Sequence, residues 1–283
     1  MDDRRLLPHC VYCGCVSLFS SIPVWALITA AVIAGLTFGS FLNVCIVRLP
    51  AHQSIVTPAS HCLHCGTPIR ARDNVPVISW VWLRGRCRAC TVGISIQYPL
   101  VELSTVALFV ACVVHTGATW QTLVDAVACF LLLGLAVMDW QTMLLPDAFT
   151  LTGIGAAFLL KVFAPGNRFR LRVAIQTLEA AAIAAALLLL VWVLYRVVRR
   201  RQGMGLGDVK LLAMVAAFMG LPVALFAYFV GVLAAALFAI VLLAQRKVRG
   251  SDRIPFGSFL AAAGILAIFL GKSAIAWYLS MFH

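Results

Sequence analysis

Long apolar stretches, interrupted by short polar segments, run through most of the chain. A helix needs about 20 apolar residues to cross a bilayer. Stretches of this character lie at 22–47, 99–117, 120–139, 148–164, 174–195, 205–221, 223–244 and 257–280. The run from Leu211 to Gln245 carries no charge and is too long for one crossing, but Gly220-Leu221-Pro222 supplies a break. The pattern predicts an all-α integral membrane protein with about eight transmembrane helices.

Composition indicates that the chain lies in a bilayer and excludes a soluble fold for the chain as a whole. The chain is 63% hydrophobic and 11% charged, whereas soluble domains are about 45–50% apolar and about 25% charged. The net charge of +12 does not indicate a nucleic-acid partner, because no basic stripe is interleaved with exposed aromatic residues. Lysine and arginine instead gather in loops, as expected on the cytoplasmic side of a membrane protein. The expected partner of the apolar surface is therefore the lipid bilayer.

The basic residues also predict the orientation of the chain. If the N-terminus is outside, most of the 22 Lys and Arg residues lie in the loops that become cytoplasmic, at 48–98, 140–147, 196–210 and 245–256. The positive-inside rule favours this arrangement. The loop near 165–173 is the exception, because it places three basic residues outside: Arg168, Arg170 and Arg172.

The chain divides into four segments. Residues 1–21 form a tail of unassigned role. This tail contains three cysteines, Cys10, Cys13 and Cys15. The uncharged stretch that begins in the tail is too long for the apolar region of a signal peptide, which is about 7–15 residues. We therefore place the first transmembrane helix at 22–47, a water-soluble cytoplasmic insert at 48–98, and the remaining seven helices at 99–283.

The insert contains two cysteine pairs, Cys62-Leu-His-Cys65 and Cys87-Arg-Ala-Cys90, separated by residues 66–86. Each pair can present two thiolates from one tight turn, and this spacing is typical of tetrahedral zinc. A metal would also replace the core that so short and polar a segment cannot build. Four reduced structural thiols and a redox role are the alternatives. Four thiolates close the coordination shell, so the predicted zinc is structural, and His61 and His64 are not expected as ligands.

Acidic residues are scarce, and three of them lie at cytoplasmic ends of the predicted helices. Asp139 ends the third apolar stretch, Asp147 follows it, and Asp208 ends the segment GMGLGD. Ionisable residues near membrane depth are costly and usually functional. Asp147 follows Pro146 and precedes an apolar run, so we interpret it as a helix N-cap. The glycines before Asp208 weaken a helix and instead permit close approach of the backbone, for example to an extended substrate.

Two carboxylates at one membrane depth can hydrolyse a peptide bond. A close pair shares one proton, because the two groups cannot readily ionise together. One carboxylate takes a proton from water while the other protonates the carbonyl oxygen. Asp139 and Asp208 are therefore predicted to be catalytic. The alternative functions are a proton-coupled transporter, in which the acids relay protons, and a non-enzymatic assembly protein.

Several motifs together resemble the type IV prepilin peptidase family, a group of GxGD aspartic proteases that combine leader peptidase and N-methyltransferase activities. The motifs are GSFLNVCIVRLP, the cysteine tetrad, DNVPVISWVWLRGRCRAC, YPLVEL, DWQTMLLPD, GMGLGDVKLL and IPFGSFL. The resemblance covers most of the chain, from about Phe38 to Leu270. The sequence departs from the family pattern at Thr91, where glycine is usual, and at Gln97, where arginine is usual.

The resemblance implies that Asp139 and Asp208 are the catalytic pair, supported by Gly205, Gly207, Asp147 and Lys210. It implies that the basic leader of type IV prepilins or pseudopilins is cut after a glycine at the cytoplasmic membrane face. The new N-terminal residue, usually phenylalanine, is then methylated with S-adenosylmethionine as methyl donor. The resemblance further implies a multi-pass protein of the bacterial inner membrane that serves type IV pilus or type II secretion assembly. Residues 99–283 would then form the membrane protease core.

Overall fold

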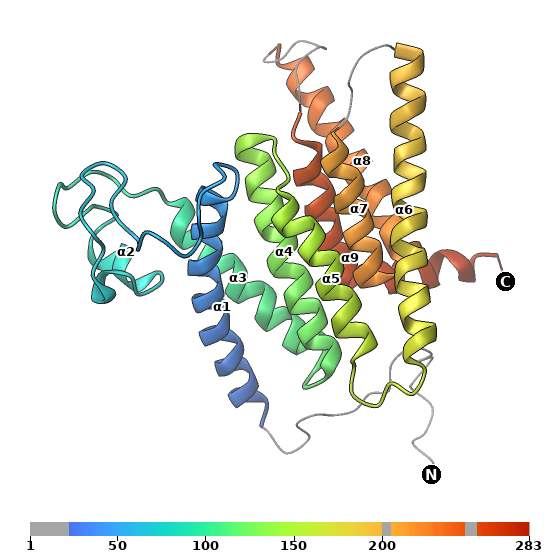
Figure 1. The fold of residues 1–283 in the computed structure, drawn as a ribbon, viewed down its shortest axis with the longest axis horizontal. Helices are drawn as coiled ribbons and strands as arrows, with labels where there is room; N and C mark the ends of the chain where they lie inside the picture. Colours follow the sequence, from blue (N-terminus) through green and yellow to red (C-terminus); the bar gives the residue numbers. More distant parts are fainter. Residues whose placement is uncertain (1–22, 200–204, 247–253, 283) are drawn as a thin grey trace.

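The computed structural model describes residues 23–199, 205–246 and 254–282, and the predicted tail at 1–21 lies outside them. The described residues are mainly helical (Figure 1). The long helices are α1 (Val24–Arg48), α3 (Gln97–Thr116), α4 (Trp120–Thr142), α5 (Asp147–Val162), α6 (Arg170–Arg199), α7 (Leu206–Met219), α8 (Leu221–Ala244) and α9 (Phe256–Ser280). The insert contains the short elements η1 (Ala71–Asp73) and α2 (Ile78–Trp82).

A helix occupies each of the predicted apolar stretches, so the prediction of an all-α membrane protein is confirmed. Among the described residues, 6 helices are long and apolar enough to cross a membrane: α1, α3, α4, α6, α8 and α9. Helices α5 and α7 are shorter, with 16 and 14 residues. The number of crossings stays a prediction. The predicted break after α7 is confirmed, because Gly220 adopts φ +85° between α7 and α8.

The shortest of these helices, α7, is the most enclosed. It packs against α4, α5, α6, α8 and α9. Its residues from Leu211 to Phe218 are all buried. A helix that is apolar on every side is stable only where other helices surround it. The bundle therefore fixes the position of α7, and with it the position of Asp208 in the first turn.

Helices α1 and α3 pack closely and carry the insert. A Cβ at Gly35 would lie 2.6 Å from Val106 Cα, so only glycine allows this backbone approach. The buried Glu102 on α3 accepts a hydrogen bond of 2.7 Å from the backbone N–H of Val77, which belongs to the insert. Asn43 on α1 donates a 3.0 Å hydrogen bond to the carbonyl of Tyr98, at the start of α3. The α1–α3 contacts hold the two helices together, and the hydrogen bond of Glu102 with Val77 attaches the insert to them at one side of the bundle (Figure 1).

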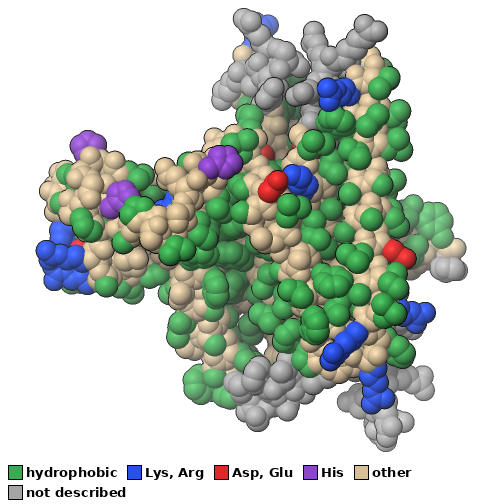
Figure 2. Space-filling model, in the orientation of Figure 1, with side chains coloured by type: hydrophobic (Ala, Val, Ile, Leu, Met, Phe, Trp, Pro, Cys, Tyr) green, Lys and Arg blue, Asp and Glu red, His purple; other side chains and the backbone are tan. Residues whose placement is uncertain are grey.

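The outer surface of the helices is largely apolar. Figure 2 shows hydrophobic side chains spread over the visible faces of the helices, while Lys and Arg gather on the insert and near helix ends. Several of the exposed side chains lie on α6 and α8, including Leu190, Leu233 and Leu237. Such a surface is stable in contact with lipid and unstable in contact with water. The chain is therefore a multi-pass membrane protein.

Candidate active site

Asp139 lies in the last turn of α4, on the face that turns toward the core. It continues the buried row of Leu132 and Leu135 at helical spacing, and only 5% of the residue is exposed. Its Oδ2 accepts a 2.6 Å hydrogen bond from the backbone N–H of Ser258, in the first turn of α9. The Ser258 hydroxyl lies 3.0 Å from the same oxygen and 2.8 Å from the carbonyl of Ala136. Because the hydroxyl has one proton, it donates to one of these oxygens at a time.

Asp208 approaches the same region from the start of α7. It is the third residue of that helix and 6% exposed, and its Oδ2 accepts a 3.2 Å hydrogen bond from the backbone N–H of Gly205. The carboxyl groups of Asp139 and Asp208 are close enough for their charges to interact. The tertiary structure therefore brings the two sequence-predicted carboxylates together at adjoining helix ends, although 68 residues of chain separate them.

The structure explains the presence of glycine at position 207 more specifically than the sequence did. A Cβ at Gly207 would lie 2.9 Å from Leu145 Cβ, so a side chain of this chain already occupies the space. The close approach at Gly207 is therefore internal and not an open track for a substrate. A Cβ at Gly205 would meet no such contact, because the nearest described atoms to it, Asp208 Oδ2 and Gly207 N, would each lie 3.8 Å away.

Asp147 does not cap a helix in the way expected from the sequence. Helix α5 has Pro146 at the N-cap position and begins at Asp147, and no side chain caps it. The N-cap interpretation is therefore wrong by one residue, because the proline rather than the aspartate adopts the extended backbone that precedes the helix. The Asp147 carboxylate instead forms a 2.6 Å ion pair with Lys210 on α7. Both partners are well exposed, so this ion pair stabilises the site only slightly.

Three residues of the site were not predicted from the sequence. Ser258 holds Asp139, Leu145 lies beside Gly207, and Tyr228 on α8 lies near the Asp208 carboxyl. The Tyr228 ring meets Phe256 edge-on, with ring centroids 6.3 Å apart. The segment IPFGSFL contains Phe256 and Ser258, but a contact made by a backbone N–H across 119 residues leaves no local signal.

The cysteine tetrad forms a compact cluster in the insert. The sulfur atoms of Cys62, Cys65, Cys87 and Cys90 all lie within 4.8 Å of one another. The Cys62 and Cys90 sulfurs are 3.8 Å apart, which matches the separation of about 3.8 Å for thiolates bound tetrahedrally at about 2.3 Å from zinc. The cluster can therefore hold a metal ion.

The two halves of the tetrad are built in the same way. Cys62 N–H donates to the Thr67 carbonyl, and Cys87 N–H donates to the Val92 carbonyl. The residue after the second cysteine is left-handed in both halves, with φ +70° at Gly66 and +57° at Thr91. This conformation explains why glycine is the usual residue at the position of Thr91.

Comparisons with known proteins give matches over most of the chain. The family described as "Type IV leader peptidase family" matches residues 126–240, and the one described as "Bacterial Peptidase A24 N-terminal domain" matches 33–116. The prepilin leader peptidase/N-methyltransferase of Aeromonas hydrophila is 36% identical over 91% of this chain and 96% of its own length. Those of Burkholderia pseudomallei (strain 1026b) and Pseudomonas putida are 33% and 35% identical, over 93% and 88% of this chain and 92% of each relative. No solved structure matches the chain.

The chain belongs to the type IV leader peptidase family. The segment matched to the leader peptidase domain contains both Asp139 and Asp208. The segment matched to the N-terminal domain spans most of α1, the insert with its tetrad, and α3. Ser258 lies outside both segments, on α9. In this leader peptidase, the two carboxylates therefore come from the peptidase domain, and a later helix holds one of them.

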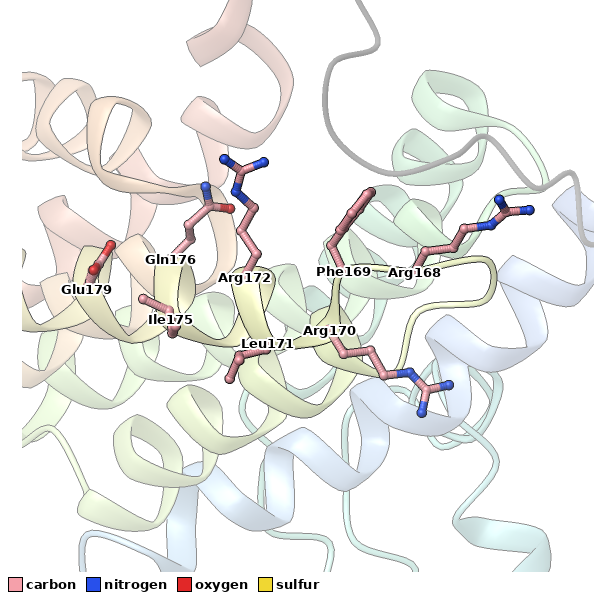
Figure 3. A pocket seen from close by; sticks show the side chains of 8 residues that line it. All are labelled: Arg168, Phe169, Arg170, Leu171, Arg172, Ile175, Gln176 and Glu179. Carbon is pink, nitrogen blue, oxygen red and sulfur yellow. The ribbon is translucent and has the colours of Figure 1, made fainter.

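A separate hollow lies at the start of α6, far from the aspartates. Helix α5 begins near the end of the bundle where α4 ends and α7 begins, and it leads away from that end, so the turn into α6 lies at the other end of the bundle (Figure 1). The hollow is lined by Arg168, Phe169, Arg170, Leu171, Arg172, Ile175, Gln176 and Glu179. Figure 3 shows that its three arginine side chains point in different directions and do not converge on one point. The hollow therefore lacks the geometry of an anion site.

Proposed function

We propose that the chain is an aspartic endopeptidase that removes the basic leader of type IV prepilins or pseudopilins, cutting after a glycine. Processing continues with N-methylation of the new N-terminal residue, with S-adenosylmethionine as the methyl donor. The observation that carries the proposal is the pairing of two buried carboxylates, Asp139 and Asp208, at adjoining helix ends in a member of the leader peptidase family. Such a pair hydrolyses peptides without a covalent intermediate.

The geometry is consistent with different proton-transfer roles for the two carboxyls, one as acceptor and one as donor. Hydrogen bonds from Ser258 fix the orientation of the Asp139 carboxyl group, and the Gly205 N–H fixes that of Asp208. Among the described residues, these hydrogen bonds to the two carboxyls use only their Oδ2 atoms, which leaves each Oδ1 for water or for the peptide carbonyl. One carboxyl takes a proton from the attacking water, while the other donates a proton to the carbonyl oxygen. When the C–N bond of the tetrahedral intermediate breaks, the first carboxyl gives its proton to the leaving amine, and the second regains a proton from a hydroxyl of the intermediate.

The position of the acids argues against a proton-coupled transporter. Transporter sites lie near the bilayer midplane, at discontinuous helices. Asp139 instead lies in the last turn of α4 and Asp208 in the first turn of α7. A scaffold protein would need neither carboxylate. The peptidase explains why two acids are buried at one edge of an otherwise apolar bundle.

The proposal includes the setting of the reaction. The distribution of basic residues supports a location of this edge of the bundle, and of the insert, at the cytoplasmic face of the bacterial inner membrane. The insert holds one structural zinc ion through Cys62, Cys65, Cys87 and Cys90, whose sulfur spacing fits that ion. The substrates belong to type IV pilus or type II secretion assembly.

Complementation tests the proposal in the cell. A bacterium that lacks its own prepilin leader peptidase accumulates unprocessed prepilin. Expression of this chain should convert the prepilin to the shorter mature form on an immunoblot. A transporter or scaffold would leave the prepilin at full length even when the chain is present in the membrane, and that result would reject the peptidase.

A further inference from the structure

The turn between α4 and α5 directs one apolar side chain toward the catalytic pair. Met143 ends α4 in a left-handed conformation with φ +53°, and its N–H donates to the Asp139 carbonyl at 2.8 Å. This conformation turns the chain back over the end of α4. Leu144 remains 51% exposed, whereas Leu145 is half-buried and packs against the core. The turn therefore points Leu145 inward beside the two aspartates.

Two glycines make room for Leu145. A Cβ at Gly207 would lie 2.9 Å from Leu145 Cβ, and a Cβ at Gly257 would lie 2.9 Å from Leu145 Cδ1. The Cβ added at Gly257 would also lie 2.9 Å from Asp139 Cγ. The Leu145 side chain therefore lies between the first turns of α7 and α9, beside the carboxyl of Asp139. The backbone of both helices limits its movement, because neither glycine offers a side chain that could rotate away.

This arrangement restricts what can lie next to the carboxylates. A peptide bond under attack must place its carbonyl between Asp139 and Asp208. A residue flanking that bond on the side of Leu145 meets an aliphatic group that is held in place, so an added methyl group overlaps with it. A residue without a Cβ avoids this overlap.

We propose that Leu145 is a specificity-determining residue, which restricts the residue before the scissile bond to glycine by filling the space that a Cβ would need. The assignment rests on the proposed leader peptidase function. Leu145 transfers no proton, and its effect is steric. Loss of its side chain therefore enlarges the range of substrates, whereas loss of a catalytic aspartate stops all cleavage.

The test compares two prepilin peptides that differ only in the residue before the scissile bond, glycine or alanine. Purified protein in detergent cleaves them, and kcat/KM is measured for each. One carbon in a tight apolar site changes kcat/KM by roughly 10- to 200-fold, so the wild type should prefer glycine by that order. Leu145→Ala should reduce this preference at least about tenfold, by gaining activity on the alanine peptide. Leu145→Val should change the preference in the same direction by a smaller factor.

Leu144→Ala is the matched control, because Leu144 is in the same turn but exposed. This control should keep the wild-type preference. An unchanged preference in Leu145→Ala, or a wild type that cuts both peptides equally, would overturn the assignment. Loss of all cleavage in both Leu145 variants, with the Leu144 control active, would also overturn it, since a specificity residue must leave the glycine peptide cleavable. A wild type that cuts neither peptide would instead reject the proposed function.

Discussion

At the scale of single residues, the two carboxylates are oriented by different parts of the chain. Asp139 is held from outside its own helix, by two donor groups of Ser258 on α9. Asp208 is held from within its own segment, by the N–H of Gly205 three residues before it. A change at Ser258 therefore acts directly on Asp139, whereas a change at Gly205 acts directly on Asp208. The two carboxylates can be examined separately.

Removal of either carboxylate should abolish leader cleavage. Asp139→Ala and Asp208→Ala each leave one acid, which cannot both activate water and protonate the carbonyl oxygen. Quantitative mass spectrometry of product from membranes with matched protein amounts measures the effect. Asp147→Asn is the control, because it breaks only the exposed ion pair with Lys210, which is worth about 0–1 kcal/mol. Asp147→Asn should stay active, and wild-type cleavage by either alanine variant would refute the catalytic assignment.

Ser258 should act as a positioning residue for Asp139. Ser258→Ala removes the hydroxyl but keeps the backbone N–H that donates at 2.6 Å. A net hydrogen bond is worth about 1 kcal/mol, so kcat should fall roughly five- to tenfold while KM stays within about twofold. Ser258→Thr retains a hydroxyl and should restore most of kcat. Equal kcat in the alanine variant and the wild type would show that the hydroxyl contributes nothing.

At the scale of elements, the insert and the membrane bundle depend on different interactions. The bundle buries large apolar side chains, for example along α7. The insert has little apolar core and depends on the cysteine cluster and on a bidentate contact between Arg88 and Asp73. That hydrogen-bonded contact with Arg88 lowers the pKa of Asp73. Metal removal should therefore affect the insert well before it affects the helices.

The insert should contain one zinc ion per chain. Elemental analysis of the purified protein measures the content directly. Replacement of Cys62 and Cys65 by serine should remove the ion, because two thiolates bind zinc far more weakly than four. Replacement of the buried Cys112 by serine is the control and should leave the zinc content unchanged. A folded wild type without metal would contradict this prediction.

The backbone at the tetrad predicts opposite effects for two substitutions. Thr91 has φ +57°, which costs a non-glycine residue about 1 kcal/mol or more, so Thr91→Gly should strengthen zinc retention. Gly66 has φ +70°, and a Cβ added there would meet no described atom within 4 Å, so Gly66→Ala should weaken retention through backbone strain alone. The chelator concentration that removes half of the zinc measures both variants. Shifts in the same direction for both would contradict the explanation.

At the scale of the whole molecule, the sequence predicted the helices better than it predicted their contacts. Apolar length locates each helix, and Gly220 locates the break between α7 and α8. Asp139 and Asp208 could be singled out from the sequence because ionisable residues are rare in an apolar chain. The ion pair of Asp147 with Lys210 and the contact of Leu145 with two glycines could not be predicted from the sequence. These contacts depend on which helix ends meet, and that information lies in the packing of the bundle.

Product mass tests the account most directly. The purified protein is incubated with a prepilin and S-adenosylmethionine, and the intact mass of the pilin is measured. We expect loss of the leader up to and including its glycine, together with a gain of one methyl group. Without S-adenosylmethionine, only the leader should be lost, and with Asp139→Ala the prepilin should keep its full mass. A prepilin that stays intact with the wild type, while the Aeromonas hydrophila relative processes it in the same buffer, would contradict the account.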